Sequence, residues 1–255
     1  MKILFAGTPK VAADILRALL TGPHEIVGVL TRTDAEVSRK RILTPSAVAE
    51  LAESAGIPVI KANRVDASVR DQIAALDAEY AVIVAYGAFL DRDALNLMPK
   101  GWTNIHYSLL PDWRGAAPVQ QALAAGDREI GVTLFDLDEG MDTGDVYLRV
   151  PTVIEPGENA GELLDRLGRL AVTALAELLP QIEAGIAAKT PQSQLAGQQR
   201  LAKKPTRQDA RLDFERTALD NENLVRAYNP EPMAWAEWQD QPFRVLEATA
   251  LGSTD

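Results

Sequence analysis

Two polar side chains near the middle of the chain, Asn104 and His106, are of types that could do chemistry. They stand two residues apart in the segment 102–106, which is predicted to be a short strand and leads into a Ser-Leu-Leu-Pro turn. Residues two apart in a strand face the same side, so the amide and the imidazole point together while Ile105 turns away to pack. At the end of a strand they could polarise a carbonyl group. A polar pair that only closes the strand would show the same pattern.

The remaining composition leaves few competing kinds of catalytic site. The chain has no cysteine, which excludes disulfides, thiolate nucleophiles and zinc–cysteine sites. The other histidine, His24, falls in a polar turn, and we therefore expect no metal centre. The acidic loop 136–145 does not fit a calcium loop, because Gly140 stands where an oxygen donor is needed and the closing Glu is absent.

The same acidic loop offers a carboxylate, Asp142, that could act with the histidine. Gly140 and Gly144 bracket it and give the backbone freedom to present its side chain. A carboxylate close to an imidazole holds the tautomer of the ring and favours its protonated form. The alternative is a simple hairpin whose acidic side chains face water.

The elements that would position these residues alternate between strands and helices. This order predicts an α/β, Rossmann-like fold with a mostly parallel sheet and helices on both faces. Thr44 is the expected cap of the second helix, with Pro45 at its first position. We expect strands at 2–6, 25–31, 57–60, 80–85, 102–106, 129–137 and 146–150, and helices at 11–20, 45–54, 67–75, from about 116, 159–187 and 220–227.

Ligands of such sheets bind at the carboxyl ends of the strands. The stretches Gly7-Thr8-Pro9 and Tyr86-Gly87, and the residues after Asn104, all fall at such ends. The first strand–helix turn lacks the G-x-G-x-x-G pattern, and the chain has no phosphate-binding P-loop. Nicotinamide chemistry and phosphoryl transfer are therefore disfavoured.

The charge and hydropathy of the chain bear on its partners and its location. The net charge is −10, so a polyanion would have to meet a local basic patch. The densest one in the amino-terminal half is Arg39, Lys40 and Arg41, in a long polar loop between Thr31 and Pro45. Such a run is often only a solvated surface, although long loops at the ligand end of a sheet tend to be functional. No apolar run approaches the roughly 20 residues of a membrane span, and the amino terminus is unlike a signal peptide, so we expect a cytoplasmic protein.

The composition shifts after the long helix, which divides the chain into domains. We predict a catalytic domain over 1–188, a linker over 189–208 and a second domain over 209–255. Arg200, Lys203, Lys204, Arg207 and Arg211 make the linker region basic enough to meet phosphates, or simply soluble. The second domain offers one helix and two paired strands around 239–241. A lone hairpin is marginal in water, so this domain is expected to be incomplete.

Several motifs together resemble those of the methionyl-tRNA formyltransferases. Asn-x-His-x-Ser-Leu-Leu-Pro with a downstream Asp is typical of enzymes that use 10-formyltetrahydrofolate, and three further motifs are typical of the tRNA-directed branch. These are Trp113-Arg-Gly-Ala-Ala-Pro-Val-Gln, Gly140-Met-Asp-Thr-Gly-Asp and the Asn-Pro-x-Pro-x-Ala-Trp stretch from Asn229 to Trp235. The resemblance runs along essentially the whole chain.

The resemblance implies a function and a set of site residues. It implies formyl transfer from 10-formyltetrahydrofolate to the α-amine of methionyl initiator tRNA, in translation initiation, by a protein that we expect to be a monomer. Asn104, His106 and Asp142 would form the catalytic triplet. The folate would be held by Ser108, Leu109, Leu110 and Pro111 with Tyr86, Gly87, Ala88, Phe89 and Leu90, and the tRNA by Arg39, Lys40, Arg41, Lys203 and Lys204.

The chain departs from the family pattern in two places, and other functions compete. The basic loop usually carries prolines and glycines, whereas here Ala35-Glu-Val-Ser precedes Arg39 and Lys40 replaces a small residue. The family also continues into a complete OB-like β-barrel, of which this chain shows the opening, so we expect weak, salt-sensitive tRNA binding. The alternatives are formyl transfer to an amino-sugar nucleotide or to glycinamide ribonucleotide, hydrolysis of 10-formyltetrahydrofolate, and a non-catalytic folate- or tRNA-binding module.

Overall fold

The structure is a computed structural model that describes residues 1–37 and 41–251. Its contacts divide the chain into two compact units, each built from several segments. The first comprises Met1–His106, Thr133–Arg149 and Gly168–Leu195, and the second comprises Tyr107–Val132, Val150–Leu167 and the residues from Ala196 on. In the described ranges, no helix is both long enough and apolar enough to cross a membrane.

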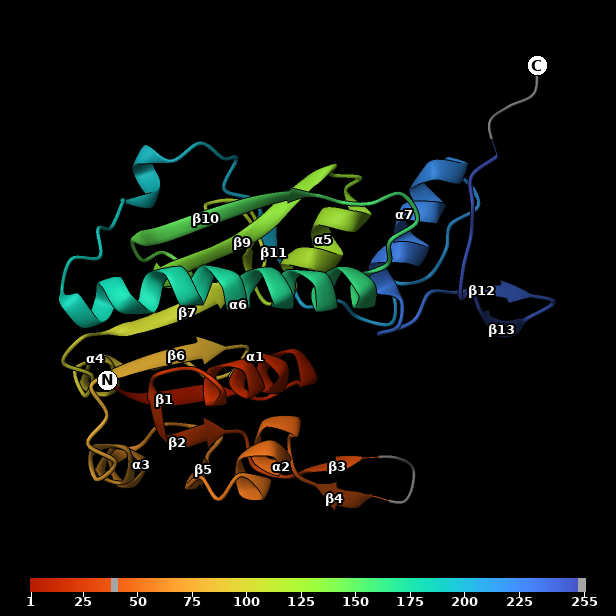
Figure 1. Cartoon of the computed structure of the whole chain (residues 1–255). Helices are drawn as coiled ribbons and strands as arrows, with labels where there is room; N and C mark the ends of the chain where they lie inside the picture. Colours follow the sequence, from red (N-terminus) through yellow and green to blue (C-terminus); the bar gives the residue numbers. More distant parts are fainter. Residues whose placement is uncertain (38–40, 252–255) are drawn as a thin grey trace. The chain divides into compact units, whose positions relative to one another are not determined.

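The first unit is built on a seven-stranded sheet with the order β10-β9-β7-β6-β1-β2-β5 (Figure 1). The pairs β1–β2, β1–β6, β2–β5 and β6–β7 are parallel, and β7–β9 is antiparallel. This confirms the predicted mostly parallel α/β sheet. The strands are β1 (Lys2–Gly7), β2 (Glu25–Thr31), β5 (Val59–Lys61), β6 (Tyr80–Val84), β7 (Trp102–His106), β9 (Glu129–Asp136) and β10 (Val146–Val153), the last two of which continue into the second unit.

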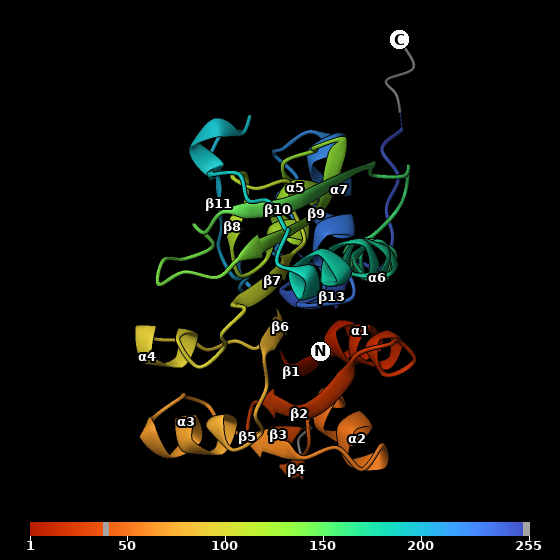
Figure 2. The same cartoon turned by 60° about the vertical axis from the view of Figure 1, so that its left-hand side comes forward.

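Helices cover both faces of this sheet, with α1 and α2 on one face and α3 and α4 on the other (Figure 2). The cap of α2 is Ser46, whose hydroxyl accepts the backbone N–H of Ala49. The prediction of Thr44 as the cap was wrong, because Thr44 belongs to a strand. The helices are α1 (Lys10–Leu20), α2 (Ala47–Ser54), α3 (Ala67–Ala74), α4 (Arg92–Leu95) and α6 (Ala160–Ala184), the last of which begins in the second unit.

The strands of the sheet carry many of the buried side chains in the core of the first unit. Trp102 at the start of β7 is 1% exposed and packs in a cluster with residues of β1, β2, β5 and β6. Tyr80 is fully buried, and its hydroxyl is hydrogen-bonded to that of Thr103 on the neighbouring strand. Burial raises the pKa of Tyr80 well above its ordinary value, so it stays a neutral partner in this pair. Burial and this hydrogen bond therefore hold β6 and β7 in a fixed register.

The loop between Thr31 and Pro45 contains a short hairpin that the sequence did not predict. Strand β3 (Ala35–Val37) pairs antiparallel with β4 (Ile42–Thr44). The predicted tRNA contacts Arg39 and Lys40 lie outside the described residues. Arg41, on the return side, has a φ of 51°, and its Nε lies 3.3 Å from a carboxylate oxygen of Glu36. Arg41 therefore lies directly before the returning strand of this hairpin.

The second unit pairs short elements from distant parts of the chain. Helices α5 (Pro118–Ala124) and α7 (Ala218–Tyr228) pack together, and β8 (Arg114–Gly115) pairs in parallel with β11 (Leu201–Ala202). Strands β12 (Trp235–Trp238) and β13 (Gln241–Arg244) pair antiparallel, which confirms the predicted hairpin (Figure 1). Within the described part of 209–251, these strands do not close a barrel.

One arginine of the basic linker is an internal anchor of the second unit. The guanidinium of Arg200 donates two parallel hydrogen bonds to Asp127, each 2.9 Å long, and lies 3.5 Å from Asp112. It also stacks on Trp113, at 4.2 Å from the ring centre, while the indole N–H donates to Asp127. These carboxylates occupy its donors, which favours a structural role for Arg200. That it could also meet a phosphate stays a prediction.

Removing this anchor should destabilise the second unit. Arg200→Ala leaves two partly buried carboxylates without their cationic partner, and we expect a loss of about 2 kcal/mol in the free energy of unfolding. Arg211→Ala is the matched control, because its pair with Glu237 is nearly half exposed on both sides and should contribute less than about 1 kcal/mol. Chemical denaturation measures both losses. Equal losses would contradict the structural role of Arg200.

A second ion pair predicts a pH dependence. Burial raises the pKa of Glu158, but hydrogen bonds from Arg166 and from the Glu155 N–H outweigh it, so the pKa lies below its ordinary value of 4.5. A lowered pKa in the folded state gives stability that is present above pH 4.5 and is lost as the pH falls through the folded value. The stability difference between the wild type and Glu158→Gln should therefore shrink in acid. Denaturation at about pH 7 and about pH 3.5 tests this, and a constant difference would contradict it.

Candidate active site

Strand β7 places Asn104 and His106 through its pairing with both neighbours. Asn104 lies opposite Ile83 of the parallel strand β6 and opposite Phe135 of the antiparallel strand β9. His106 lies opposite Thr133. Directly opposite residues of an antiparallel pair face the same side, as do residues two apart in one strand. The amide and the imidazole therefore share one face of the sheet, as predicted.

The surroundings of the imidazole are buried. His106 is 6% exposed, while Thr133 and Phe135 are fully buried. The imidazole meets the ring of Phe135 edge-on, with 6.4 Å between ring centres and an angle of 84° between the planes. This contact fixes the ring orientation on one side. Asn104 is half-buried.

Asp142 approaches His106 from the loop between β9 and β10. Its Oδ2 lies 3.9 Å from His106 Nδ1, and its side chain is 15% exposed. This is longer than a direct hydrogen bond, and catalytic contacts are often long before substrate binds. The carboxylate and the imidazole are thus close enough to act together.

The flanking glycines act differently from the prediction. The left-handed φ of 54° falls on Asp142 itself, a conformation that Asp tolerates better than most residues. A Cβ at Gly140 would stand 1.9 Å from the hydroxyl of Thr143, and one at Gly144 would stand 1.8 Å from the carbonyl oxygen of Asp136. The glycines are needed for close packing of the loop on itself.

Two further side chains hold this loop, and the sequence analysis missed both. Asp138 accepts hydrogen bonds from the hydroxyl of Thr143 and the backbone N–H of Gly140. The buried amide of Gln192 donates to the carbonyl oxygens of Asp142 and Gly144. Asp138 and Thr143 are close in the sequence, and their residue types could have indicated a turn. Gln192 lies in the predicted linker, where no sequence pattern indicated a contact with this loop.

The first predicted folate segment, Tyr86 to Leu90, follows β6 in the first unit. The Tyr86 side chain is 1% exposed and its hydroxyl donates to the Ala62 carbonyl, so it belongs to the core, while its own carbonyl accepts a hydrogen bond from the Thr8 hydroxyl. Burial raises the pKa of this hydroxyl to about 12. Arg32 donates to the Gly87 carbonyl, whereas Phe89 is 75% exposed.

The second predicted folate segment, Ser108 to Pro111, lies in the second unit. Ser108 is fully buried and its hydroxyl donates to the Asp112 carbonyl at 2.6 Å, so it closes the turn. Leu110 is fully buried as well. Leu109 packs against Gly131, where an added Cβ would stand 2.5 Å from the leucine side chain. The turn is therefore rigid.

The predicted tRNA contacts Lys203 and Lys204 also belong to the second unit. Both side chains are exposed, and the Lys203 carbonyl accepts a hydrogen bond from Gln121 of α5. Arg207 and Arg211 stack near Trp235, at 4.9 and 5.6 Å from its ring. The lysines are thus held on an ordered segment and present their ammonium groups to solvent.

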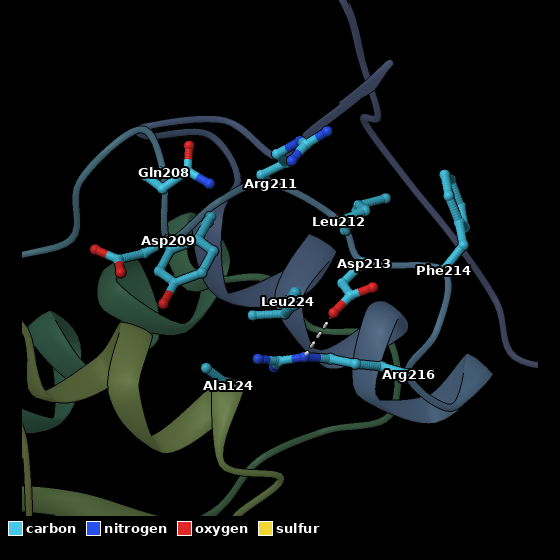
Figure 3. Close-up of a pocket in the computed structure, with 10 residues that line it drawn as sticks. Ala124, Gln208, Asp209, Arg211, Leu212, Asp213, Phe214, Arg216 and Leu224 are labelled. Carbon is cyan, nitrogen blue, oxygen red and sulfur yellow. Dashed lines mark ion pairs between the residues drawn. The ribbon is translucent and has the colours of Figure 1, made fainter. Parts of the chain in front are cut away.

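A cavity of about 560 Å³ also lies in the second unit, beside α5 and α7. Its wall carries an ion pair between Arg216 and Asp213, with 3.8 Å between the charged atoms (Figure 3). Basic, acidic and apolar side chains line it, among them Arg211 of the basic linker region, but none of the predicted catalytic or folate-binding residues. The cavity therefore gives no support to a second catalytic centre.

The geometry in the first unit is suited to acyl transfer without a covalent intermediate. An amide and an imidazole on one face can donate hydrogen bonds to a developing oxyanion. A carboxylate next to the imidazole can orient it and accept a proton. The chain has no cysteine to serve as a thiolate nucleophile.

Comparison with known proteins places this chain in a family. The model of the Formyl transferase family matches residues 1–179, and that of the Formyl transferase, C-terminal domain matches residues 204–255. A methionyl-tRNA formyltransferase of Arthrobacter sp. is 47% identical over 251 residues, which are 98% of this chain and 81% of that protein. One of Cutibacterium acnes is 45% identical over 257 residues, covering 100% of this chain and 81% of that protein.

Solved structures with lower sequence identity share the fold. A 4-N formyltransferase from Francisella tularensis superposes with a TM-score of 0.74 at 14% identity, covering 98% of each chain. A phosphoribosylglycinamide formyltransferase from Bacillus halodurans gives a TM-score of 0.60 at 23% identity, covering 70% of this chain and 95% of that one. The fold is thus shared among formyltransferases with different acceptors, whereas the high identities single out one branch. This chain belongs to the formyl transferase family and, within it, to the methionyl-tRNA formyltransferases.

Proposed function

We propose that this protein transfers the formyl group of 10-formyltetrahydrofolate to the α-amine of methionyl initiator tRNA, for the initiation of protein synthesis in the cytoplasm. The observation that carries the proposal is the 42–47% identity, over at least 98% of this chain, to proteins named methionyl-tRNA formyltransferase. The arrangement of Asn104, His106 and Asp142 in the first unit supports it, because this reaction needs stabilisation of the formyl oxyanion and removal of a proton from the attacking amine.

In the proposed reaction the amine nitrogen attacks the formyl carbon and forms a tetrahedral intermediate. The formyl oxygen becomes an oxyanion, to which Asn104 and His106 donate hydrogen bonds. The bond between the formyl carbon and N10 of the folate then breaks, N10 takes a proton, and the amine nitrogen loses one. The products are formylmethionyl-tRNA and tetrahydrofolate.

Asp142 has two roles in this proposal. Its carboxylate faces Nδ1 of His106, so it orients the ring; the other nitrogen donates to the formyl oxygen in the form of the imidazole that carries a hydrogen on both nitrogens. It also accepts the amine proton, directly or through a water molecule. The buried, edge-on contact between His106 and Phe135 supports these roles, because a fixed ring does not have to be ordered during the reaction.

Binding of the two substrates is proposed for the remaining predicted residues. The segment Tyr86 to Leu90 and the turn of Ser108 to Pro111, which the Ser108 hydroxyl closes, would hold the folate. Arg39, Lys40 and Arg41 of the β3–β4 segment, with the exposed Lys203 and Lys204, would meet tRNA phosphates. The protein is proposed to act as a monomer.

Single substitutions in the triplet test the mechanism. We expect Asn104→Ala, His106→Gln and Asp142→Asn each to lower the single-turnover rate of formylation by about 10²–10³-fold, because each removes a group that acts on the transition state. His24→Gln is the matched control, since His24 lies in the turn after α1, outside the proposed site. A near-normal rate in His106→Gln or Asp142→Asn would refute the assigned roles.

The acceptor is tested with the wild-type protein and labelled 10-formyltetrahydrofolate. Label should pass to charged initiator tRNA in preference to an amino-sugar nucleotide or glycinamide ribonucleotide. Transfer mainly to either of these small acceptors would assign the chain to another activity of the fold. Release of formate at the same rate without any acceptor would indicate a hydrolase.

Removal of the exposed lysines should weaken tRNA binding in a salt-dependent way. Each duplex phosphate contact contributes about 0.9 to the slope of log K against log salt, so the double variant Lys203→Ala, Lys204→Ala should lose up to about 1.8 from the slope. Lys10→Ala is the control, because Lys10 pairs with Asp14 on α1. Binding titrations at several salt concentrations measure the slope. An unchanged slope would exclude these lysines from the interface.

A further inference from the structure

Gln192 is a buried polar side chain in a segment whose composition predicts a polar linker. It begins the short 3-10 helix Gln192–Gln194 and is 4% exposed. It lies between the residues matched by the two family models, which end at 179 and resume at 204. A buried amide is costly unless its donors and acceptors are satisfied, so its partners show what it does.

Its amide group binds the backbone of the loop that carries Asp142. Nε2 of Gln192 donates to the carbonyl oxygen of Asp142 at 2.9 Å and to that of Gly144 at 2.8 Å. One nitrogen thus spans three residues of the loop and uses both of its hydrogens there. Both contacts lie inside the first unit.

The conformation that these bonds hold is one the chain would not keep by itself. Asp142 has a φ of 54°, in the sparsely populated left-handed region. A residue keeps such a conformation only where its surroundings determine it strongly. If the backbone of Asp142 returned to a common region, its Cα–Cβ bond would turn and the carboxylate would leave Nδ1 of His106.

The residues before Gln192 hold the two ends of the same loop. Thr190 and Val146 exchange backbone hydrogen bonds of 2.8 Å in both directions, which fixes the end of the loop. Lys189 lies 2.5 Å from the carboxylate of Asp136, which fixes its start. The segment 189–192 therefore contacts the loop at its beginning, at its end and, through Gln192, at the catalytic position.

We propose that Gln192 is a positioning residue for formyl transfer, which holds the backbone of Asp142 so that its carboxylate faces His106. The inference rests on the proposed function, since Gln192 acts only through Asp142 and touches no reacting atom. It adds to that function a residue outside the motifs of the catalytic domain.

The test compares two glutamines of the same short helix. Gln192→Met keeps the length of the side chain and removes both donors, while Gln194→Met makes the same change at an exposed position. We expect Gln192→Met to lower kcat by roughly 10²-fold with the KM for both substrates unchanged, because misplacing a catalytic group costs about that much. Gln194→Met should match the wild type. Gln192→Glu, which places a carboxylate against the two carbonyl oxygens, should lose at least as much rate as Gln192→Met.

A readout without substrates keeps the test independent of activity. Amide hydrogen exchange in residues 137–145 of the ligand-free protein should accelerate in Gln192→Met and not in Gln194→Met, because the loop loses its anchor. Unchanged exchange in Gln192→Met would overturn the inference. So would faster exchange with an unchanged kcat.

A double-variant comparison separates the inference from the proposed function. If Gln192 acts through Asp142, then Gln192→Met should have little further effect on kcat once Asp142→Asn is present. Equal kcat losses from Gln192→Met in both backgrounds would overturn the inference and leave the function standing. A full rate in Asp142→Asn alone would instead refute the proposed role of Asp142, and the inference would fall with it.

Discussion

The antiparallel register between β7 and β9 is the constraint on which the candidate site depends. It places Thr133 opposite His106 and Asp136 opposite Thr103, so β9 ends beside the start of β7. The loop to Asp142 therefore begins about 10 Å before the histidine along the strand, given roughly 3.3 Å per residue. It must turn back along β7 to bring the carboxylate to 3.9 Å from the imidazole. The left-handed Asp142, the close approach at Gly144 and the contacts from Gln192 all serve this reversal.

The sequence predicted the features that depend on a repeating pattern of apolar residues or on residues close together in the chain. Apolar runs located the strands of the sheet, and alternation along 102–106 was enough to place Asn104 and His106 on one face. Gln192 could not be found in this way. It lies 48 residues from Gly144, in a polar stretch with no periodicity, and its burial is decided by how the chain returns after α6. A pairing that the sequence pattern does not show also explains why Ser46, and not Thr44, caps α2. Thr44 is a residue of strand β4, which pairs with β3.

Basic residues show how far composition alone can mislead about partners. Arg200, Lys203 and Arg211 belong to one basic stretch of the sequence, yet the structure gives them different environments. Arg200 is bound by two aspartates and a tryptophan, and Arg211 by Glu237, whereas the side chain of Lys203 is exposed. In a protein with a net charge of −10, the number of cations that can meet a polyanion is therefore smaller than their count indicates.

The proposed chemistry explains why such indirect contacts would matter. A formyl transfer from a folate nitrogen to an amine without a covalent enzyme intermediate has little to gain from an activated nucleophile on the protein, so the rate depends on position and on donors aimed at the oxyanion. Two of the three proposed groups, Asn104 and His106, take their position from strand pairing that the core already fixes. Only the carboxylate stands on a loop, and its backbone is in a conformation that has to be held. The demand for precision therefore falls on the residues that hold the loop, and the buried amide of Gln192 contacts the backbone of Asp142 directly.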